Sequence, residues 1–298
     1  MKPADRPRLG FIGAGVVGTV LAGAFAGAGY PVAAIHSRNA ERQAAAARGA
    51  RARAVPAAQD VVALADVVFL TVPDDAIVAT AAGVRWSRSK AVVHCNGAAS
   101  LDLLAGPRSQ GAAVGAFHPL QSFAAEEQAR RNLPGSAITI DASTEALLAE
   151  LEAMVVALGG RPLALHGDRA VYHLSAVIAS NYLVTLLDLA AGLWGELGLS
   201  KEEGLRALLP LVRGTVENLD RVGLPAALTG PIARGDIGTI QRHLEVLDRV
   251  APEARTMYKE LARRTIPIAL AKGRIGAATA RRLAGSLGDE QGDDDACG

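Results

Sequence analysis

The sequence has few cysteines and few aromatic residues, and its charges nearly cancel. It contains two cysteines, Cys95 and Cys297, and only 4% of its 298 residues are Phe, Trp or Tyr. Two distant cysteines provide neither a disulfide framework nor a metal-binding spacing, and they fit a reducing compartment such as the cytoplasm. The 31 basic and 30 acidic residues give a formal net charge of +1. Without a basic excess or aromatic stacking residues, we expect no nucleic-acid partner.

The sequence also has little that indicates a membrane protein. The charged, proline-containing residues 1–8 are not followed by an apolar segment with a cleavage site, so we expect no signal peptide. One apolar segment, Leu174–Trp194, is long enough to cross a bilayer. It contains Asn181 and Asp188, whose polar side chains are costly in lipid, so we expect a buried helix instead. We therefore predict a cytoplasmic protein with no membrane partner.

Half of the residues are apolar, and a length of 298 residues favours two domains. Residues 1–165 alternate short β-branched runs with helical patterns, which predicts an α/β Rossmann domain with a doubly wound parallel sheet. Residues 166–286 are helical in pattern throughout, interrupted by glycine and proline, and predict an all-helical domain. The acidic residues 287–298 predict a disordered tail. We expect strands at 9–12, 32–35, 66–72, 91–95, 112–117, 137–140 and 162–165, and helices at 16–28, 40–48, 144–158 and 170–197.

A glycine-rich motif lies between the first expected strand and the first expected helix. It reads Gly13-Ala14-Gly15-Val16-Val17-Gly18, which is G-x-G-x-x-G. The first glycine permits a tight turn, the second lets the backbone approach a pyrophosphate, and the third allows close packing. The N-terminus of the following helix would supply free N–H groups to the phosphates. The motif predicts a dinucleotide site, with Thr71, Val72 and Pro73 lining it; the alternative is a glycine-rich turn without a ligand.

The end of the second expected strand indicates which dinucleotide would bind. An NAD site needs Asp or Glu there, but no carboxylate occurs before Glu41. Ser37 and Arg38 occupy the position instead and can hold a 2′-phosphate, so we predict NADP(H). The alternative is that Arg38 is an ordinary solvated side chain. The pair Asp74-Asp75, which follows Pro73, is interpreted as a cap and dipole partner of the helix that starts there, and not as a pair of metal ligands.

Two histidines are candidates for the proton transfer that accompanies hydride transfer. His118 follows a buried strand at the edge of the sheet where such folds bind ligands. His173 lies early in the long helix, and Asn181 follows eight residues later on nearly the same face. The alternative for either histidine is a structural role. We expect Asn96 to bind substrate or the nicotinamide amide, Asn181 to orient the substrate at the catalytic site, and Arg234 to bind a substrate carboxylate.

These motifs together resemble a family of Rossmann-like proteins, described as NADP-dependent oxidoreductases, with a helical C-terminal domain of unknown function. The similarity extends over nearly the whole chain. The wider group includes pyrroline-5-carboxylate reductase, ketopantoate reductase, prephenate dehydrogenase and 6-phosphogluconate dehydrogenase-like enzymes. The segments that carry the resemblance to the first family are Gly13–Gly18, Phe69–Asp75, His94–Ala98, Phe117–Gln121, Tyr172-His173, Ser180–Tyr182 and Gly230–Asp236.

The resemblance implies a C-terminal domain like that of 6-phosphogluconate dehydrogenase, and a homodimer. His118-Pro119-Leu120 is similar to a motif of prephenate dehydrogenases whose histidine faces the substrate, which supports an acid–base role for His118. The long helix resembles that of ketopantoate reductase, but His173 replaces its catalytic lysine and Val177 replaces one of its two asparagines. Neither ketopantoate nor β-hydroxyacid chemistry can therefore be transferred.

We accordingly predict an NADP(H)-dependent oxidoreductase that transfers hydride to or from a small carbonyl, hydroxy acid or imine in the interdomain cleft. The substrate is expected to bear a carboxylate. One alternative is a non-catalytic NADP(H) sensor, which the missing lysine would favour. Another is a deazaflavin-dependent oxidoreductase, since those enzymes share the glycine motif.

Overall fold

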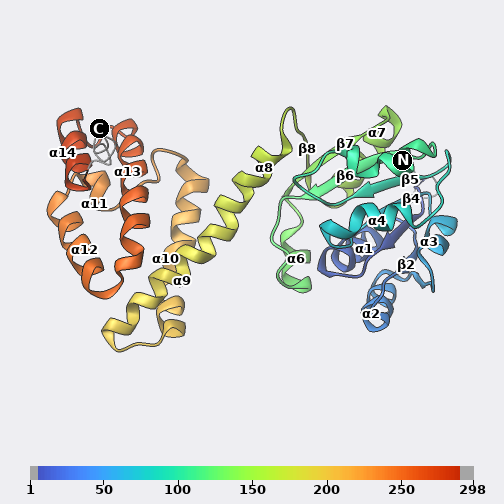
Figure 1. Cartoon of the computed structure of the whole chain (residues 1–298), viewed down its shortest axis with the longest axis horizontal. Helices are drawn as coiled ribbons and strands as arrows, with labels where there is room; N and C mark the ends of the chain where they lie inside the picture. Colours follow the sequence, from blue (N-terminus) through green and yellow to red (C-terminus); the bar gives the residue numbers. More distant parts are fainter. Residues whose placement is uncertain (1–5, 289–298) are drawn as a thin grey trace, which may run out of the picture. The chain divides into compact units, whose positions relative to one another are not determined.

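The structure is a computed structural model that describes residues 6–288 (Figure 1). It divides into two compact units between Ser180 and Asn181, within the long helical segment and beyond the boundary expected near residue 165. Most of the acidic tail predicted at 287–298, including Cys297, lies outside the described residues.

The first unit is built on one eight-stranded sheet in the order β3-β2-β1-β4-β5-β6-β7-β8. The strands β1 to β6 are parallel, which confirms the doubly wound Rossmann fold, whereas β7 runs antiparallel to β6 and pairs in parallel with β8. The two-residue edge strand β3 was not expected, because so short a segment carries no periodicity. The strands are β1 (Leu9–Ile12), β2 (Val32–His36), β3 (Arg53–Ala54), β4 (Val67–Leu70), β5 (Ala91–His94), β6 (Ala113–Pro119), β7 (Ala137–Ala142) and β8 (Arg161–Ala164).

Helices cover both faces of this sheet, and each face has its own apolar core. Successive strand residues point to opposite faces, so Phe69 packs with α1 on one side while Leu70 packs with α3 and α4 on the other. Four phenylalanines form the centre of the first core; the rings of Phe11 and Phe69 stack at 5.2 Å. The helices are α1 (Val16–Gly27), α2 (Ala40–Ala50), α3 (Ala58–Leu64), η2 (Asp74–Ala76), α4 (Ile77–Ala82), η3 (Leu101–Leu104), α5 (Ala105–Ser109), α6 (Glu126–Asn132) and α7 (Glu145–Ala157).

The register of the central strands aligns their carboxyl ends at one edge of the sheet. Ile12 pairs with Leu70, Leu70 with His94, and His94 with Ala116. The loops that follow β1, β4, β5 and β6 therefore leave the sheet side by side. This is the edge where open α/β sheets bind ligands.

The second unit is helical, as expected. Its main core gathers apolar side chains from α11 to α14, including Ile240, Ile266 and Leu283. A capping box starts α10, because the Glu203 carboxylate accepts from the Ser200 N–H at 2.8 Å and the Ser200 hydroxyl accepts from the Glu203 N–H at 3.2 Å. The helices are α9 (Tyr182–Gly192), η5 (Leu193–Leu197), α10 (Lys201–Val222), α11 (Pro231–Arg234), α12 (Ile237–Val250), η6 (Pro252–Ala254), α13 (Arg255–Ala271) and α14 (Ala277–Ser286).

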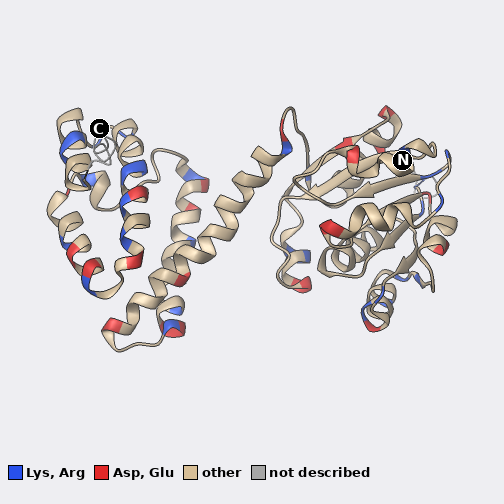
Figure 2. Cartoon of the chain, in the orientation of Figure 1, with Lys and Arg blue, Asp and Glu red and all other residues tan. Residues whose placement is uncertain are grey.

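The long apolar helical segment runs from Arg169 to Leu197 and is interrupted by a π-helical turn. It consists of α8 (Arg169–Ala176), the π-turn η4 (Val177–Asn181), α9 and η5. It is long and apolar enough to cross a membrane, but Asp188 lies on it and pairs with Lys201 at 2.5 Å. Figure 2 shows how few charged residues it carries.

The expectation that this segment is buried is wrong for the single chain, because only 6% of its most apolar window is buried. The apolar pattern predicts that the helix avoids water, but it does not predict which surface covers it.

Candidate functional site

The glycine-rich motif forms a tight turn that could bind a ligand. Gly13 has a φ of +113°, and a Cβ on it would lie 2.4 Å from the Thr71 carbonyl oxygen. A Cβ on Gly18 would lie 2.3 Å from the Gly13 carbonyl oxygen. A Cβ on Gly15, by contrast, would meet no atom within 4 Å. Packing therefore requires Gly13 and Gly18, whereas Gly15 keeps its backbone accessible from outside.

Thr71 fixes this turn to the end of β4. Its hydroxyl is buried and donates to the Gly13 carbonyl oxygen at 2.8 Å. The helix α1 begins at Val16 with Gly15 as its N-cap, and no side chain caps it. Its first N–H groups consequently point into the space above Gly15, where an anion would satisfy them.

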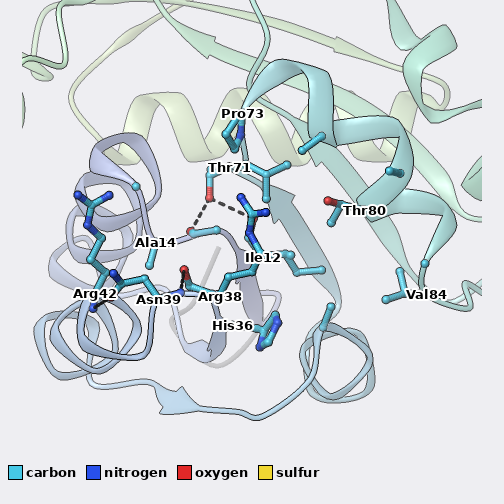
Figure 3. Close-up of a pocket in the computed structure, with 18 residues that line it drawn as sticks. Ile12, Ala14, His36, Arg38, Asn39, Arg42, Thr71, Pro73, Thr80 and Val84 are labelled. Carbon is cyan, nitrogen blue, oxygen red and sulfur yellow. Dashed lines mark hydrogen bonds between the residues drawn. The ribbon is translucent and has the colours of Figure 1, made fainter.

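A cavity of about 620 Å³ opens beside the turn (Figure 3). Of the predicted cofactor residues, Val16, Val17 and Gly18 do not line it; they begin α1 behind the turn. The remaining eight do line it. The lining residues are Ile12, Gly13, Ala14, Gly15, His36, Ser37, Arg38, Asn39, Arg42, Ala58, Thr71, Val72, Pro73, Ala76, Ala79, Thr80, Gly83 and Val84.

One end of the cavity is polar and positively charged. Ser37, Arg38 and Arg42 line it there, and Figure 3 shows the Arg38 and Arg42 side chains on either side of Asn39, with their guanidinium groups apart. The Asn39 side chain caps α2 by accepting from the Arg42 N–H at 2.9 Å. Arg42 was not expected at this site, although its spacing of four residues from Arg38 could have indicated it. Among the described residues that line the cavity, none is Asp or Glu.

The aspartates after β4 lie at the start of a short 3-10 helix. Asp74 and Asp75 lie in the first turn of η2, whose N-cap is Pro73, so the predicted capping role is wrong while a dipole role fits. Over residues 6–288 there is no cluster of three or more His, Cys, Asp or Glu side chains that could hold a metal.

A second group of polar side chains lies further along the same edge of the sheet. His118 is near the end of β6, and its Nδ1 is 2.8 Å from the Tyr172 hydroxyl on α8. The two rings are perpendicular, with centroids 5.7 Å apart. Gly97 also packs closely against the imidazole, since a Cβ there would lie 2.8 Å from both its Cε1 and its Nε2. The ring of His118 is thus held between the loop after β5 and α8.

His94, at the end of β5, is also part of this group. It is fully buried, and its Nδ1 accepts from the Asn96 N–H at 3.2 Å. The Asn96 side chain accepts from the N–H groups of Ala98 and Ala99 at 2.8 Å each. Asn96 is therefore held in a turn beside the group, which leaves its amide nitrogen for the predicted contact.

The surroundings keep both histidines neutral at physiological pH. Burial lowers the pKa of His118 to about 4, with further contributions from His173, Arg169 and His94. Burial and Arg169 likewise lower the pKa of His94 to about 4, against an opposing effect of the Ser100 backbone. Both rings are therefore uncharged in the free protein and can each donate through one nitrogen and accept through the other.

The remaining predicted residues lie in different places. His173 is exposed on α8 and close enough to His118 to influence its pKa. Asn181 and Arg234 are exposed in the second unit, at the end of η4 and the end of α11. The roles predicted for Asn181 and Arg234 stay predictions.

Two family models match the chain. Residues 8–96 match the family described as NADP oxidoreductase coenzyme F420-dependent. Residues 136–265 match the Domain of unknown function (DUF2520). No curated protein matches the sequence.

Several solved structures share the fold. A Bacteroides fragilis protein assigned as an NADP oxidoreductase is 25% identical, with a TM-score of 0.71 over 88% of this chain and 98% of that one. A Thermotoga maritima protein is 23% identical, with a TM-score of 0.73 over 88% and 99%. The 1-pyrroline-5-carboxylate reductase of Streptococcus pyogenes is 15% identical, with a TM-score of 0.59 over 94% and 99%. These likenesses match the Rossmann and helical architecture predicted from the sequence.

The packing around the glycines predicts different effects for two substitutions. Gly15→Ala should leave the free energy of unfolding within about 0.5 kcal/mol, because the added methyl group meets only open space. Gly18→Ala should lower it by about 1 to 3 kcal/mol, because the methyl group collides with backbone and Thr71. Urea denaturation followed by circular dichroism measures both. Equal destabilisation by the two substitutions would contradict a ligand-facing Gly15.

Proposed function

We propose that this chain, which carries an NADP oxidoreductase domain and a DUF2520 domain, transfers hydride between NADP(H) and a small carbonyl, hydroxy acid or imine. The observation that carries the proposal is the uncapped start of α1 beside a cavity that contains two arginines and no carboxylate. Pyrophosphate and 2′-phosphate are the anions that such a site would bind.

The fit to the phosphorylated cofactor comes from the end of β2. The ribose of NAD is normally held by an Asp or Glu at this position. Ser37 can instead donate a hydrogen bond to a 2′-phosphate, and the guanidinium groups of Arg38 and Arg42 can pair with it. These three residues would therefore select NADP(H) over NAD(H).

The strand order suggests where the reactive end of the cofactor would lie. Neighbouring strands are about 4.8 Å apart, so the end of β6 is roughly 14 Å along the edge from the end of β1. The nicotinamide, which supplies or accepts the hydride when bound, would extend past Thr71 toward Asn96. We propose that the Asn96 side chain holds its carboxamide or the substrate.

His118 is the proposed acid–base residue. Reduction of a carbonyl adds one hydride to carbon and one proton to oxygen, and a positioned side chain has to provide the proton. The Tyr172 hydroxyl and Gly97 hold the His118 ring at the sheet edge, and Nε2 is the ring nitrogen that does not contact Tyr172. In the reverse direction the neutral imidazole would accept the proton from an alcohol. His173 is the second candidate for this role.

Coenzyme F420 is a second candidate for the hydride acceptor or donor, because the family matched by residues 8–96 is described as dependent on it. In that case a deazaflavin would replace the small carbonyl compound. Stopped-flow mixing of the NADPH-loaded protein with coenzyme F420 distinguishes the two. Tight NADPH binding without turnover of either class of acceptor would instead favour a sensor.

We also propose a homodimer formed through the exposed apolar helices. Residues Val184 on α9 and Leu211 on α10 are 69% and 68% exposed, and the two helices pack side by side (Figure 1). Large exposed apolar patches mark protein interfaces or membrane contacts. A second copy of the chain would cover this surface and place the apolar helix of a cytoplasmic enzyme away from water.

The cofactor assignment predicts a selective loss of affinity. Arg38→Ala should weaken NADPH binding by about 10- to 100-fold, because a charge-assisted hydrogen bond contributes about 1.5 to 3 kcal/mol. Binding of NADH, which lacks the phosphate, should change little. Isothermal titration calorimetry measures both, with Arg48→Ala at the exposed end of α2 as the control. A wild-type protein that binds NADH more tightly than NADPH would refute the assignment.

The acid–base assignment predicts that removing the His118 imidazole lowers turnover without lowering the affinity for the cofactor. With any substrate found in a panel of carbonyl and imine compounds, His118→Asn should lower kcat about 100-fold or more. Calorimetry should give unchanged NADPH affinity. His243→Asn is the control, because that imidazole also contacts a tyrosine hydroxyl, Tyr258 at 2.9 Å, but in the second unit. Unchanged turnover in His118→Asn would transfer the role to His173.

If the chain forms a homodimer through α9 and α10, charged residues introduced on these helices should disrupt it. The double variant Val184→Asp/Leu211→Asp should sediment as a monomer, because two carboxylates cannot be buried against an apolar partner. Val156→Asp changes an equally exposed valine on α7 and should leave the dimer intact. Analytical ultracentrifugation measures the mass of each; a monomeric wild type would contradict the proposal.

A further inference from the structure

Arg169 is a buried cation without a carboxylate partner. It is the first residue of α8 and only 9% exposed. Its Nη2 donates to the Thr139 hydroxyl at 3.2 Å, and its Nε has no hydrogen-bond acceptor. Within residues 6–288 it forms no ion pair with an acidic side chain. Burying an unpaired charge costs free energy, and a bound anion would offset that cost. A buried arginine without an anionic partner therefore indicates an anion-binding site.

The side chains that contact or influence Arg169 include a hydroxyl donor and titratable rings, and the preceding Asp168 instead caps α8 by accepting from the Ala170 N–H. Thr139 lies on β7 directly opposite His118 in the sheet register, and its hydroxyl is 3.5 Å from the His118 carbonyl oxygen. The guanidinium is therefore fixed beside the proposed acid–base residue. The loop after β5 closes the group from the other side through Gly97.

A second buried donor lies in the same group. Because Nδ1 of His94 accepts from the Asn96 N–H, the proton of this neutral ring is on Nε2. That nitrogen is fully buried and forms no hydrogen bond of normal geometry within the described residues, although the Ser100 backbone is close enough to raise the pKa of the ring as a weak acceptor. The elements β5 and α8 thus each contribute a buried donor whose hydrogen bonding a ligand could complete.

We propose that Arg169 binds the carboxylate of the substrate and thereby positions the reacting carbon beside His118. The proposal rests on the proposed oxidoreductase function and narrows its substrate to a carbonyl or imine compound that carries a carboxylate close to the reacting carbon. A guanidinium matches a carboxylate with two parallel N–H donors. Arg169 is better suited to this task than the exposed Arg234, because it is desolvated and lies in the same unit as His118.

An anion at Arg169 also has a consequence for proton transfer. In the free protein the pKa of His118 is about 4, because burial disfavours the imidazolium and interactions with His173, Arg169 and His94 lower the pKa further. Tyr172, which faces the ring from α8, is neutral. A carboxylate would offset the charge of Arg169 and raise the pKa of His118. Substrate binding would thus favour the protonated imidazole that carbonyl reduction needs.

Acetate is the probe, and its neutral isostere acetamide is the control. In protein labelled with ¹³C at histidine Cε1, acetate should raise the pKa of His118 by about 1 or more, as an opposite charge nearby does. Acetamide, or chloride at the same ionic strength, should not. NMR titration against pH measures the change, and His118→Asn assigns the signal.

Two variants test whether Arg169 is the anchor. Arg169→Gln should abolish the acetate effect, and Arg169→Lys, which keeps the charge without the bidentate geometry, should weaken it. Arg161→Gln, an exposed arginine on the adjacent strand β8, should leave it unchanged. Thermal unfolding and NADPH binding show whether each variant is folded. No response of wild-type His118 to acetate would overturn the proposal, as would loss of the response in Arg234→Gln but not in Arg169→Gln.

The test of the carboxylate site at Arg169 can fail or succeed independently of the test of the proposed oxidoreductase function. If NADPH fails to bind while acetate still shifts His118, the anion site stands and the cofactor assignment fails. If NADPH binds and acetate has no effect, the cofactor assignment stands and the carboxylate site fails. With a substrate in hand, Arg169→Gln should raise KM about 10- to 100-fold for the acid and leave KM for its amide unchanged.

Discussion

The close packing of two glycines against the end of β4 is the constraint on which the first unit depends. Gly13 and Gly18 lie so near the Thr71 backbone and hydroxyl that a side chain on either would collide. This contact fixes the start of α1 above the ends of β1 and β4, with its N–H groups free. The cavity beside it exists because the turn occupies so little volume. A larger residue at either position would move the helix and remove the proposed phosphate site.

The two polar groups at the sheet edge share an electrostatic character. The cavity beside β2 contains Arg38 and Arg42, and the group at β5, β6 and α8 contains Arg169, His94 and His118. Neither includes a carboxylate among the described residues that form it. In each group the protein supplies donors and positive charge while a ligand would supply the negative charge. The cofactor proposal requires a phosphorylated dinucleotide in the first group, and the proposal for Arg169 requires a carboxylic acid in the second.

The first unit includes α8, and this explains how the second polar group forms. Arg169, Tyr172 and His173 follow the last strand of the sheet and lie on the first turns of the long helical segment. The π-turn Val177–Asn181 comes directly after them. Such turns change the register of the side chains on either side, and they are common near functional sites. The spacing of eight between His173 and Asn181 is therefore a weaker guide to a shared face than it is in a regular α-helix.

The sequence by itself determined the Rossmann fold, the helical second half and the glycine turn, because β-branched runs, helical periodicity and G-x-G-x-x-G are local signals. It also predicted that Ser37, Arg38 and His118 lie at the carboxyl edge of the sheet, because they occur at or just after the ends of strands. Tertiary structure decided the rest. The contacts of His118 with Tyr172 and Gly97, and the burial of Arg169 against Thr139, join residues 21 to 54 positions apart through the order of the strands. No local pattern in the sequence encodes the order of the strands. The burial of Arg169, which makes its charge costly to leave unpaired, arises only when the chain has folded.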